Sequence, residues 1–337
     1  MRILLAICGL TIALGSISSL AQSEPAQSST SALTVALTID DLPFVTGNST
    51  RPTQPVDAKA AAAANHKLLA AIAKHHVPVT GFVIQKSVED LGLESGTKIL
   101  REWTDRGLDL GNHSYAHPDF NNLNVEQFED QVVRGEAVIG PLMQAANRKL
   151  EFFRFPMNHT GDTKEKHDAL AAFLAQRGYR TAPCTIETED WMFNAKYFLM
   201  RSHHDDAAAA RLRADYLAFT AAQIDYFTML DKQVLGYDAP QIMLIHDNQL
   251  NADVIENLLA LFDKRQYRFI TLAQAESDPI YQAPETLITS YGPMWAYRWA
   301  KERNIKVDGS KEPEPPKWIT DYGLAEPPTP RRPRAKF

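Results

Sequence analysis

The chain contains very little cysteine. Its 337 residues include two cysteines, Cys8 and Cys184, and Cys8 lies within an apolar N-terminal segment. If that segment is removed on export, Cys184 remains alone and no internal disulfide can form. The fold must then be stabilised by an ordinary hydrophobic core, which a chain of this length can build.

Apolar runs long enough to span a membrane are absent as well. The apolar residues 3–15 follow Met1-Arg2 and precede Ser19-Leu20-Ala21, a small-x-small pattern. A short positive start, a short apolar centre and small residues form, in this order, a secretory signal peptide. We therefore expect a signal peptide over residues 1–21, cleavage near Ala21, no membrane span, and a periplasmic or secreted protein.

An excess of basic residues is also lacking. The chain has 35 Lys and Arg against 41 Asp and Glu, a formal net charge of −6, and no basic stripe. A surface for nucleic acid is therefore not expected. A repeat at a fixed period, the mark of a solenoid, is not seen either.

Short β-branched segments alternate with amphipathic segments along most of the chain. We expect strands at residues 33–39, 77–84, 108–110, 151–155, 179–182, 241–245 and 267–271, and helices at 56–75, 97–106, 125–145, 164–177, 195–201, 207–230 and 252–265. This alternation is typical of a parallel α/β architecture, either a barrel or an open sheet.

The two ends of the chain differ from this main part. Residues 22–32 are polar and indicate a linker, and ten of the 20 prolines fall in residues 276–337. Proline limits regular structure, so we expect a main domain over residues 33–275 and a partly packed C-terminal extension. Within the extension, residues 291–299 are apolar enough for a short helix, whereas the basic end at 331–337 is expected to be disordered.

Two acidic residues and two histidines suggest a metal site. Asp40 and Asp41 close the first expected strand, and His113 and His117 follow the strand at 108–110 with i, i+4 spacing. In α/β barrels the carboxyl ends of the strands carry the active site, and two adjacent carboxylates are costly unless a cation compensates one. One carboxylate and two imidazoles can hold a divalent metal with open positions, and the other carboxylate can take a proton from water. Zinc is the expected ion, and cobalt or nickel would also fit.

Other polar residues also follow expected strands. Arg154 could pair with a carboxylate, Asp190 stands beside Trp191, and His246 ends the strand at 241–245. Each has an ordinary explanation as a surface arginine, a helix cap or a structural histidine, but their joint occurrence at strand ends indicates one site. A second metal site in the His-His-Asp-Asp segment at 203–206 is less favoured than a polar break between helices, because adjacent histidines on a helix point apart.

The order of five motifs resembles the polysaccharide deacetylases, carbohydrate esterase family 4 with its NodB-homology domain. The motifs are Ile39-Asp40-Asp41, His-Ser-Tyr-Ala-His at 113–117, Arg154-Phe155-Pro156, Asp190-Trp191, and Leu-Ile-His-Asp at 244–247. The resemblance covers about residues 33–275. It implies a distorted, TIM-barrel-like (β/α) barrel with fewer than eight parallel strands.

The resemblance also implies a role for each matching residue. Asp40 would be the catalytic base, His246 the general acid, Arg154 the residue that orients the base, and Asp190 part of the charge network. The implied metal ligands are Asp41, His113 and His117, and the implied substrate-binding residues are Met157, Trp191 and Leu244. Three positions depart from the usual motifs: Leu42 where glycine is usual, Met157 where an aromatic is usual, and Glu187 where aspartate is usual.

The expected activity is metal-assisted removal of N-acetyl groups, or of O-acetyl groups, from a cell-wall or chitin-like glycan. Asp40, with a depressed pKa, would accept the proton of water, His246 would protonate the leaving amine, and the Met157 N–H would help to hold the oxyanion. Two alternatives stay open: hydrolysis of a non-sugar amide on the same scaffold, and a periplasmic glycan-binding protein without turnover. The presence of both Asp40 and His246 argues against the second.

Overall fold

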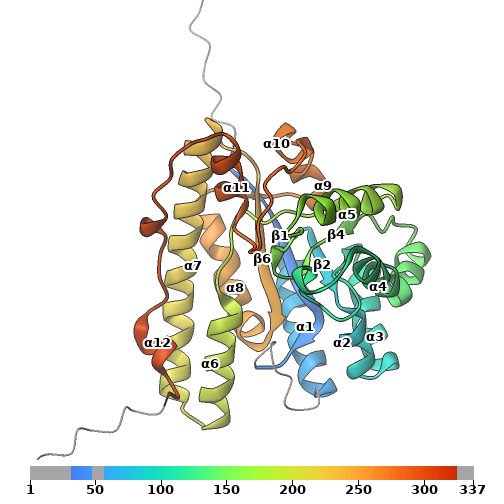
Figure 1. Cartoon of the computed structure of the whole chain (residues 1–337). Helices are drawn as coiled ribbons and strands as arrows, with labels where there is room; N and C mark the ends of the chain where they lie inside the picture. Colours follow the sequence, from blue (N-terminus) through green and yellow to red (C-terminus); the bar gives the residue numbers. More distant parts are fainter. Residues whose placement is uncertain (1–31, 48–56, 325–337) are drawn as a thin grey trace, which may run out of the picture. The chain divides into compact units, whose positions relative to one another are not determined.

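The structure, a computed structural model, describes residues 32–47 and 57–324 (Figure 1). The expected signal peptide at 1–21, nearly all of the expected linker and the basic end at 331–337 lie outside these residues. Among the helices that are described, none combines the length and the apolar character needed to cross a membrane.

A parallel sheet forms the centre of the fold (Figure 1). Its order is β5-β4-β3-β2-β1-β6, with β7 paired to the start of β1. All paired strands are parallel. The strands are β1 (Thr34–Val45), β2 (Val79–Val83), β3 (Asp109–Asn112), β4 (Phe152–Phe153), β5 (Arg180–Thr181), β6 (Gln241–Asn248) and β7 (Arg268–Phe269). The prediction of a parallel α/β fold with fewer than eight strands is confirmed.

The two edges of the sheet meet through the residues that follow β5. Ile186 pairs with Met243 of β6 in a parallel bridge. The N–H of Thr185 donates to the carbonyl of Ile242 at 2.9 Å, and the N–H of Leu244 donates to the carbonyl of Ile186 at 3.0 Å. These bonds close the sheet into a distorted barrel, so the carboxyl ends of β1 and β6 face those of β3, β4 and β5 across its interior.

A ring of helices encloses the barrel, packed in the order α5, α4, α3, α1, α8, α7, α6. These helices are α1 (Ala58–Lys74), α3 (Leu93–Asp105), α4 (Val125–Ala145), α5 (Lys164–Gln176), α6 (Asp190–Ser202), α7 (Asp206–Leu235) and α8 (Gln249–Lys264). Side-chain caps mark several of their ends. Asn124 and Gln127 form a capping box at the start of α4, and Asp205 caps the start of α7. Gly236 follows the last residue of α7, and its φ of 86° suits a residue without Cβ.

The side chains of β1 alternate between two environments, as in any strand with both faces covered. Val35, Leu37 and Ile39 belong to the large core beneath the helices, whereas Ala36 joins Phe82 in a small cluster inside the barrel. Asp40 lies on the same side of β1 as Ala36. Its side chain therefore enters the interior of the barrel, where the carboxyl ends of the strands lie.

Two local features differ from the sequence-based expectation. β1 does not end at Ile39 but runs to Val45, and its register with β2 shifts between Ile39 and Leu42. Asp41 lies at this irregularity with φ 64°, a left-handed conformation that re-aims its side chain. The short helix α2 (Gln85–Asp90) was also missed, because it has no side-chain cap and is only six residues long.

The C-terminal extension packs on the barrel as far as residue 324. The main domain ends with α9 (Leu272–Ala275), and the extension then contains α10 (Pro279–Gln282), α11 (Trp295–Glu302) and α12 (Lys317–Asp321). After α11 the chain follows the length of α7 (Figure 1). Ile319 of α12 is fully buried, and the indole N–H of Trp318 donates to Asp215 of α7 at 2.8 Å.

Replacing Ile319 with alanine should therefore destabilise the protein by about 2–5 kcal/mol, the usual cost of emptying a buried isoleucine site. The matched control is Leu324→Ala, because Leu324 is 64% exposed. It should change stability by less than about 0.5 kcal/mol. Urea unfolding of both variants measures this difference, and equal midpoints would show that α12 does not contribute to the core.

Candidate active site

A cavity of about 830 Å³ opens at the carboxyl ends of the strands. Eight of the ten predicted site residues line it. They are Asp40, Asp41, His113, His117, Met157, Trp191, Leu244 and His246. The other two, Arg154 and Asp190, are completely buried beside it. Residues from segments more than 200 positions apart are thus brought together at one place.

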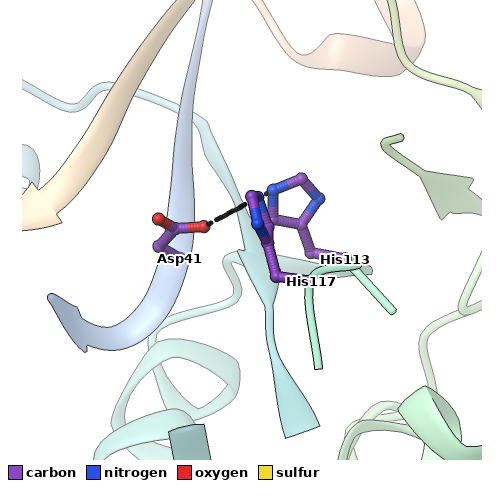
Figure 2. Close-up of side chains that lie close together, drawn as sticks. All are labelled: Asp41, His113 and His117. Atoms are coloured by element: carbon purple, nitrogen blue, oxygen red, sulfur yellow. Dashed lines mark ion pairs between the residues drawn. The ribbon is translucent and has the colours of Figure 1, made fainter. Parts of the chain in front are cut away.

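Asp41, His113 and His117 form a group that could hold a metal ion. One ligand atom from each lies within 4.8 Å of the others. The Asp41 carboxylate faces both imidazole rings, with Oδ1 3.5 Å from Nε2 of His113 and 3.7 Å from Nε2 of His117 (Figure 2). Tetrahedral bonds of about 2.1 Å would place neighbouring ligand atoms about 3.4 Å apart. The two distances from Asp41 are therefore close to those expected between ligands of a small divalent ion.

The surroundings of this group also fit a metal. Nδ1 of His113 donates to the carbonyl of Arg154 at 2.8 Å, which leaves the lone pair of Nε2 facing Asp41. Burial lowers the pKa of His113 well below its ordinary value, so the imidazole is neutral, as a ligand must be. Oδ1 of Asp41 is buried and has no hydrogen-bond partner among the described residues. A cation would supply the partner that this oxygen lacks.

Unusual backbone conformations gather around the cavity. Asp41, Ser114, His117, Met157 and Glu189 all have φ between 51° and 70° although none is glycine. Such conformations cost about 1–3 kcal/mol each and persist where surrounding contacts impose them. These five residues lie in or beside the segments that carry the predicted site residues, so the surrounding contacts hold that part of the barrel in a defined shape.

Asp40 is held by Arg154 inside the barrel. The guanidinium donates to Oδ1 of Asp40 at 2.8 Å, to Oγ1 of Thr38 at 2.6 Å and to the carbonyl of Pro183 at 2.9 Å. It also stacks on the ring of Phe82. The predicted pairing of Arg154 with Asp40 is present. The expected depression of the Asp40 pKa was wrong: burial raises this pKa, and the opposing effect of Arg154 is smaller.

His246 lies beside Asp40 on the neighbouring strand. Asp40 and His246 are direct partners in the register of β1 and β6. Asp190, the first residue of α6, accepts from Nδ1 of His246 at 2.7 Å and from its backbone N–H at 2.7 Å. Burial alone would lower the pKa of His246, but the Asp190 carboxylate raises it to about 10. His246 is therefore protonated at neutral pH, with Nε2 left for the cavity.

The network behind Asp190 was not predicted. The side-chain amides of Asn248 and Asn251 both donate to Oδ2 of Asp190. Asn248 also caps α8, since its side chain accepts from the N–H of Asn251. The start of a helix after β6 is a signal in the sequence that could have identified Asn248 as a helix cap. The contact of Asn248 with Asp190 of α6 depends on tertiary structure, so the sequence contains no signal for it.

Among the residues that the structure describes, the segment at 203–206 is not part of a group that could hold a metal ion. Asp205 caps α7 and accepts from the hydroxyl of Tyr322, and Asp206 pairs with Arg201. The favoured interpretation, a polar break between α6 and α7, agrees with these contacts.

Comparison with known proteins finds a family model that matches part of the chain. Residues 27–179 match the family model for polysaccharide deacetylase. Over these residues, which make up less than half of the chain, it is similar to the polysaccharide deacetylase family, in agreement with the resemblance drawn from its motifs. The match ends before Asp190 and His246, so the family model does not cover these two residues. Their interpretation depends on the geometry described above.

One relative is a peptidoglycan-N-acetylglucosamine deacetylase from Bacillus cereus, 22% identical over 125 residues. The match spans 37% of this chain and 40% of that relative's length. Among solved structures, a peptidoglycan deacetylase from Bacillus subtilis is 19% identical with a TM-score of 0.44, over 74% of this chain and 92% of the other. A family 4 pseudoenzyme from Bacillus anthracis is 17% identical with a TM-score of 0.44, over 73% of this chain and 66% of the other.

Proposed function

We propose that this protein is a metal-dependent hydrolase that removes N-acetyl groups from a cell-wall or chitin-like glycan. The observation that carries the proposal is the meeting, at one cavity, of three candidate ligands, the Asp40–Arg154 pair and the Asp190–His246 pair. The name of the Bacillus cereus relative points to the same reaction class. Zinc is the proposed ion for Asp41, His113 and His117, and cobalt and nickel are the alternatives.

A divalent ion bound there would supply Lewis-acid polarisation of the acetyl carbonyl and lower the pKa of water. Asp40 would accept the proton of the attacking water, and its raised pKa makes it a stronger base than an ordinary aspartate. Arg154 would fix the orientation of that carboxylate. His246, protonated because of Asp190, would donate a proton to the leaving nitrogen.

The walls of the cavity suit a sugar chain. Trp191 and Met157 line the cavity and remain 45% and 43% exposed, so they offer apolar faces to a sugar ring. Leu244 lies beside His246 and could contact the acetyl methyl group. The Met157 N–H is the proposed donor to the oxyanion.

Acetate release in the presence of added zinc, cobalt or nickel tests this function. Chitin oligomers, peptidoglycan and acetylated xylan are the glycan substrates, and small formamides and imides are the non-sugar controls. Release from a glycan with no turnover of the small amides supports the proposal. Turnover of small amides alone would favour the alternative hydrolase, and glycan binding without any release would favour a binding protein.

The proposed place of action is the periplasm or the extracellular space. It depends on the N-terminal segment, whose order of charge and apolarity suits a signal peptide. Mass spectrometry of the exported protein should find a new N-terminus close to Gln22. An uncleaved chain retained in the cytoplasm would contradict this location.

Replacing Asp190 with asparagine should move the alkaline limb of the pH profile to lower pH. The carboxylate raises the pKa of His246, so its removal lets His246 lose its proton at lower pH. A neighbouring charge is typically worth about 1–3 pKa units. The measurement is kcat/KM against pH for both proteins, with metal content as the control. An unchanged alkaline limb would exclude His246 as the acid.

A further inference from the structure

The C-terminal extension reaches the cavity at Gly292. This residue lines the cavity together with Met157 and Asn158. A Cβ added at Gly292 would lie 1.9 Å from the carbonyl oxygen of Met157 and 2.8 Å from Cβ of Asn158. Only glycine allows the extension to approach so closely. The extension therefore contacts the turn that carries the proposed oxyanion donor.

That turn has a conformation that it would not adopt without support. Met157 and Asn158 are consecutive non-glycine residues with φ of 56° and 55°. The turn has two hydrogen bonds that link N–H groups to carbonyls of its own backbone, from Asn158 to Phe155 and from His159 to Pro156, each 3.1 Å long. Two left-handed residues in succession cost more than such bonds typically contribute.

Arg298 of α11 supplies the support. Its side chain is 1% exposed, and its guanidinium donates to the carbonyl of Asn158 at 2.6 Å and to Oγ1 of Thr160 at 3.2 Å. The same group donates to the carbonyl of Pro293 at 2.9 Å, next to Gly292. One guanidinium thus joins the residues after Met157 to the segment that carries Gly292.

Glu285 completes this arrangement. Its carboxylate pairs with Arg298 and accepts from the hydroxyl of Thr160. Arg298 is also stacked on the ring of Trp295, with 4.4 Å from Cζ to the ring centroid. A buried, paired and stacked arginine has little freedom to move, so it can hold the turn in one position.

We propose that Arg298 and Gly292 are positioning residues for the reaction, because they fix the Met157–Asn158 turn and so aim the Met157 N–H at the reacting carbonyl. The inference rests on the proposed deacetylase function and assigns a catalytic purpose to the C-terminal extension. Positioning of a transition-state donor affects kcat more than KM, because the ground-state carbonyl gains little from it.

Gly292→Ala is the first test, with Gly309→Ala as its matched control in the same extension. A Cβ at Gly309 meets only the Tyr297 side chain, at 3.7 Å or more, so this change should leave kcat within about twofold. Gly292→Ala should lower kcat by about 10–100-fold with KM within about threefold, since small misplacements at a reacting centre have effects of this size. A wild-type kcat for Gly292→Ala would overturn the proposal.

Arg298→Met is the second test, with Arg303→Met as its control. Arg303 follows α11 and donates to the carbonyl of Val234, far along the chain from the turn. Hydrogen exchange measured by mass spectrometry should show faster exchange of the peptide over residues 155–161 in Arg298→Met and not in Arg303→Met. This readout needs no activity, so it separates the two proposals: if the wild type releases no acetate, the function fails, and if exchange is unchanged, the positioning role fails.

Discussion

Asp40→Asn is expected to lower kcat by about 10²–10⁴-fold while metal binding stays intact, because general-base catalysis is typically worth this much. The substitution keeps the size of the side chain and can still accept from Arg154, but it removes the group that takes a proton from water. Asp40 lies outside the set of three candidate ligands. Metal content by mass spectrometry, together with acetate release at saturating substrate, measures both effects on one sample.

Asp231→Asn is the control for loss of a buried carboxyl group. Asp231 is 1% exposed on α7, and burial raises its pKa to about 8, so it is already uncharged near neutral pH. Its replacement should leave kcat within about twofold. A wild-type kcat for Asp40→Asn on every acetylated glycan would rule out Asp40 as the base, whatever the control shows.

His117→Ala should remove metal and activity together. Removal of a hydrogen-bond partner of a metal ligand typically lowers metal affinity 10–100-fold, and removal of the ligand itself should lower it further. Wild-type protein with zinc at 100 times its Kd should gain about 2.7 kcal/mol of stability, and the variant should gain almost none. Thermal unfolding with and without zinc, alongside metal stoichiometry, gives the result.

His203→Ala is the matched control. His203 is exposed at the end of α6 and lies outside the Asp41-His113-His117 group. Its replacement should leave both the stoichiometry and the zinc-dependent stabilisation unchanged. One metal per chain in His117→Ala would contradict the ligand assignment, and a loss of metal in His203→Ala would point to a second site at 203–206.

The placement of the site could be predicted from the sequence because strand ends of a parallel barrel share one face. Asp40, His113, Arg154 and His246 each follow or end an apolar segment, and the barrel brings them to one cavity. The adjacency of Asp40 and His246 follows from β1 and β6 being neighbours. Periodicity finds strands but does not give their order in the sheet.

The parts that could not be predicted depend on tertiary contacts. The bulge at Asp41 has no signature in residue type, since the left-handed conformation there is imposed by the surrounding structure. The direction of the Asp40 pKa depends on how deeply the barrel buries the carboxyl group. The contact of Arg298 with Asn158 joins residues 140 positions apart, and the proline content around Arg298 suggested only partial packing.

The left-handed residues around the cavity have a consequence for engineering. Glycine at Ser114, Met157 or Glu189 would relieve backbone strain, and strain relief is among the ordinary routes to a more heat-resistant protein. The same change would let the loops that carry His117 and the Met157 N–H sample other shapes. Selection of this protein for thermostability alone should therefore enrich glycine at these positions and yield stable variants with poor turnover, so a useful library would keep these positions fixed.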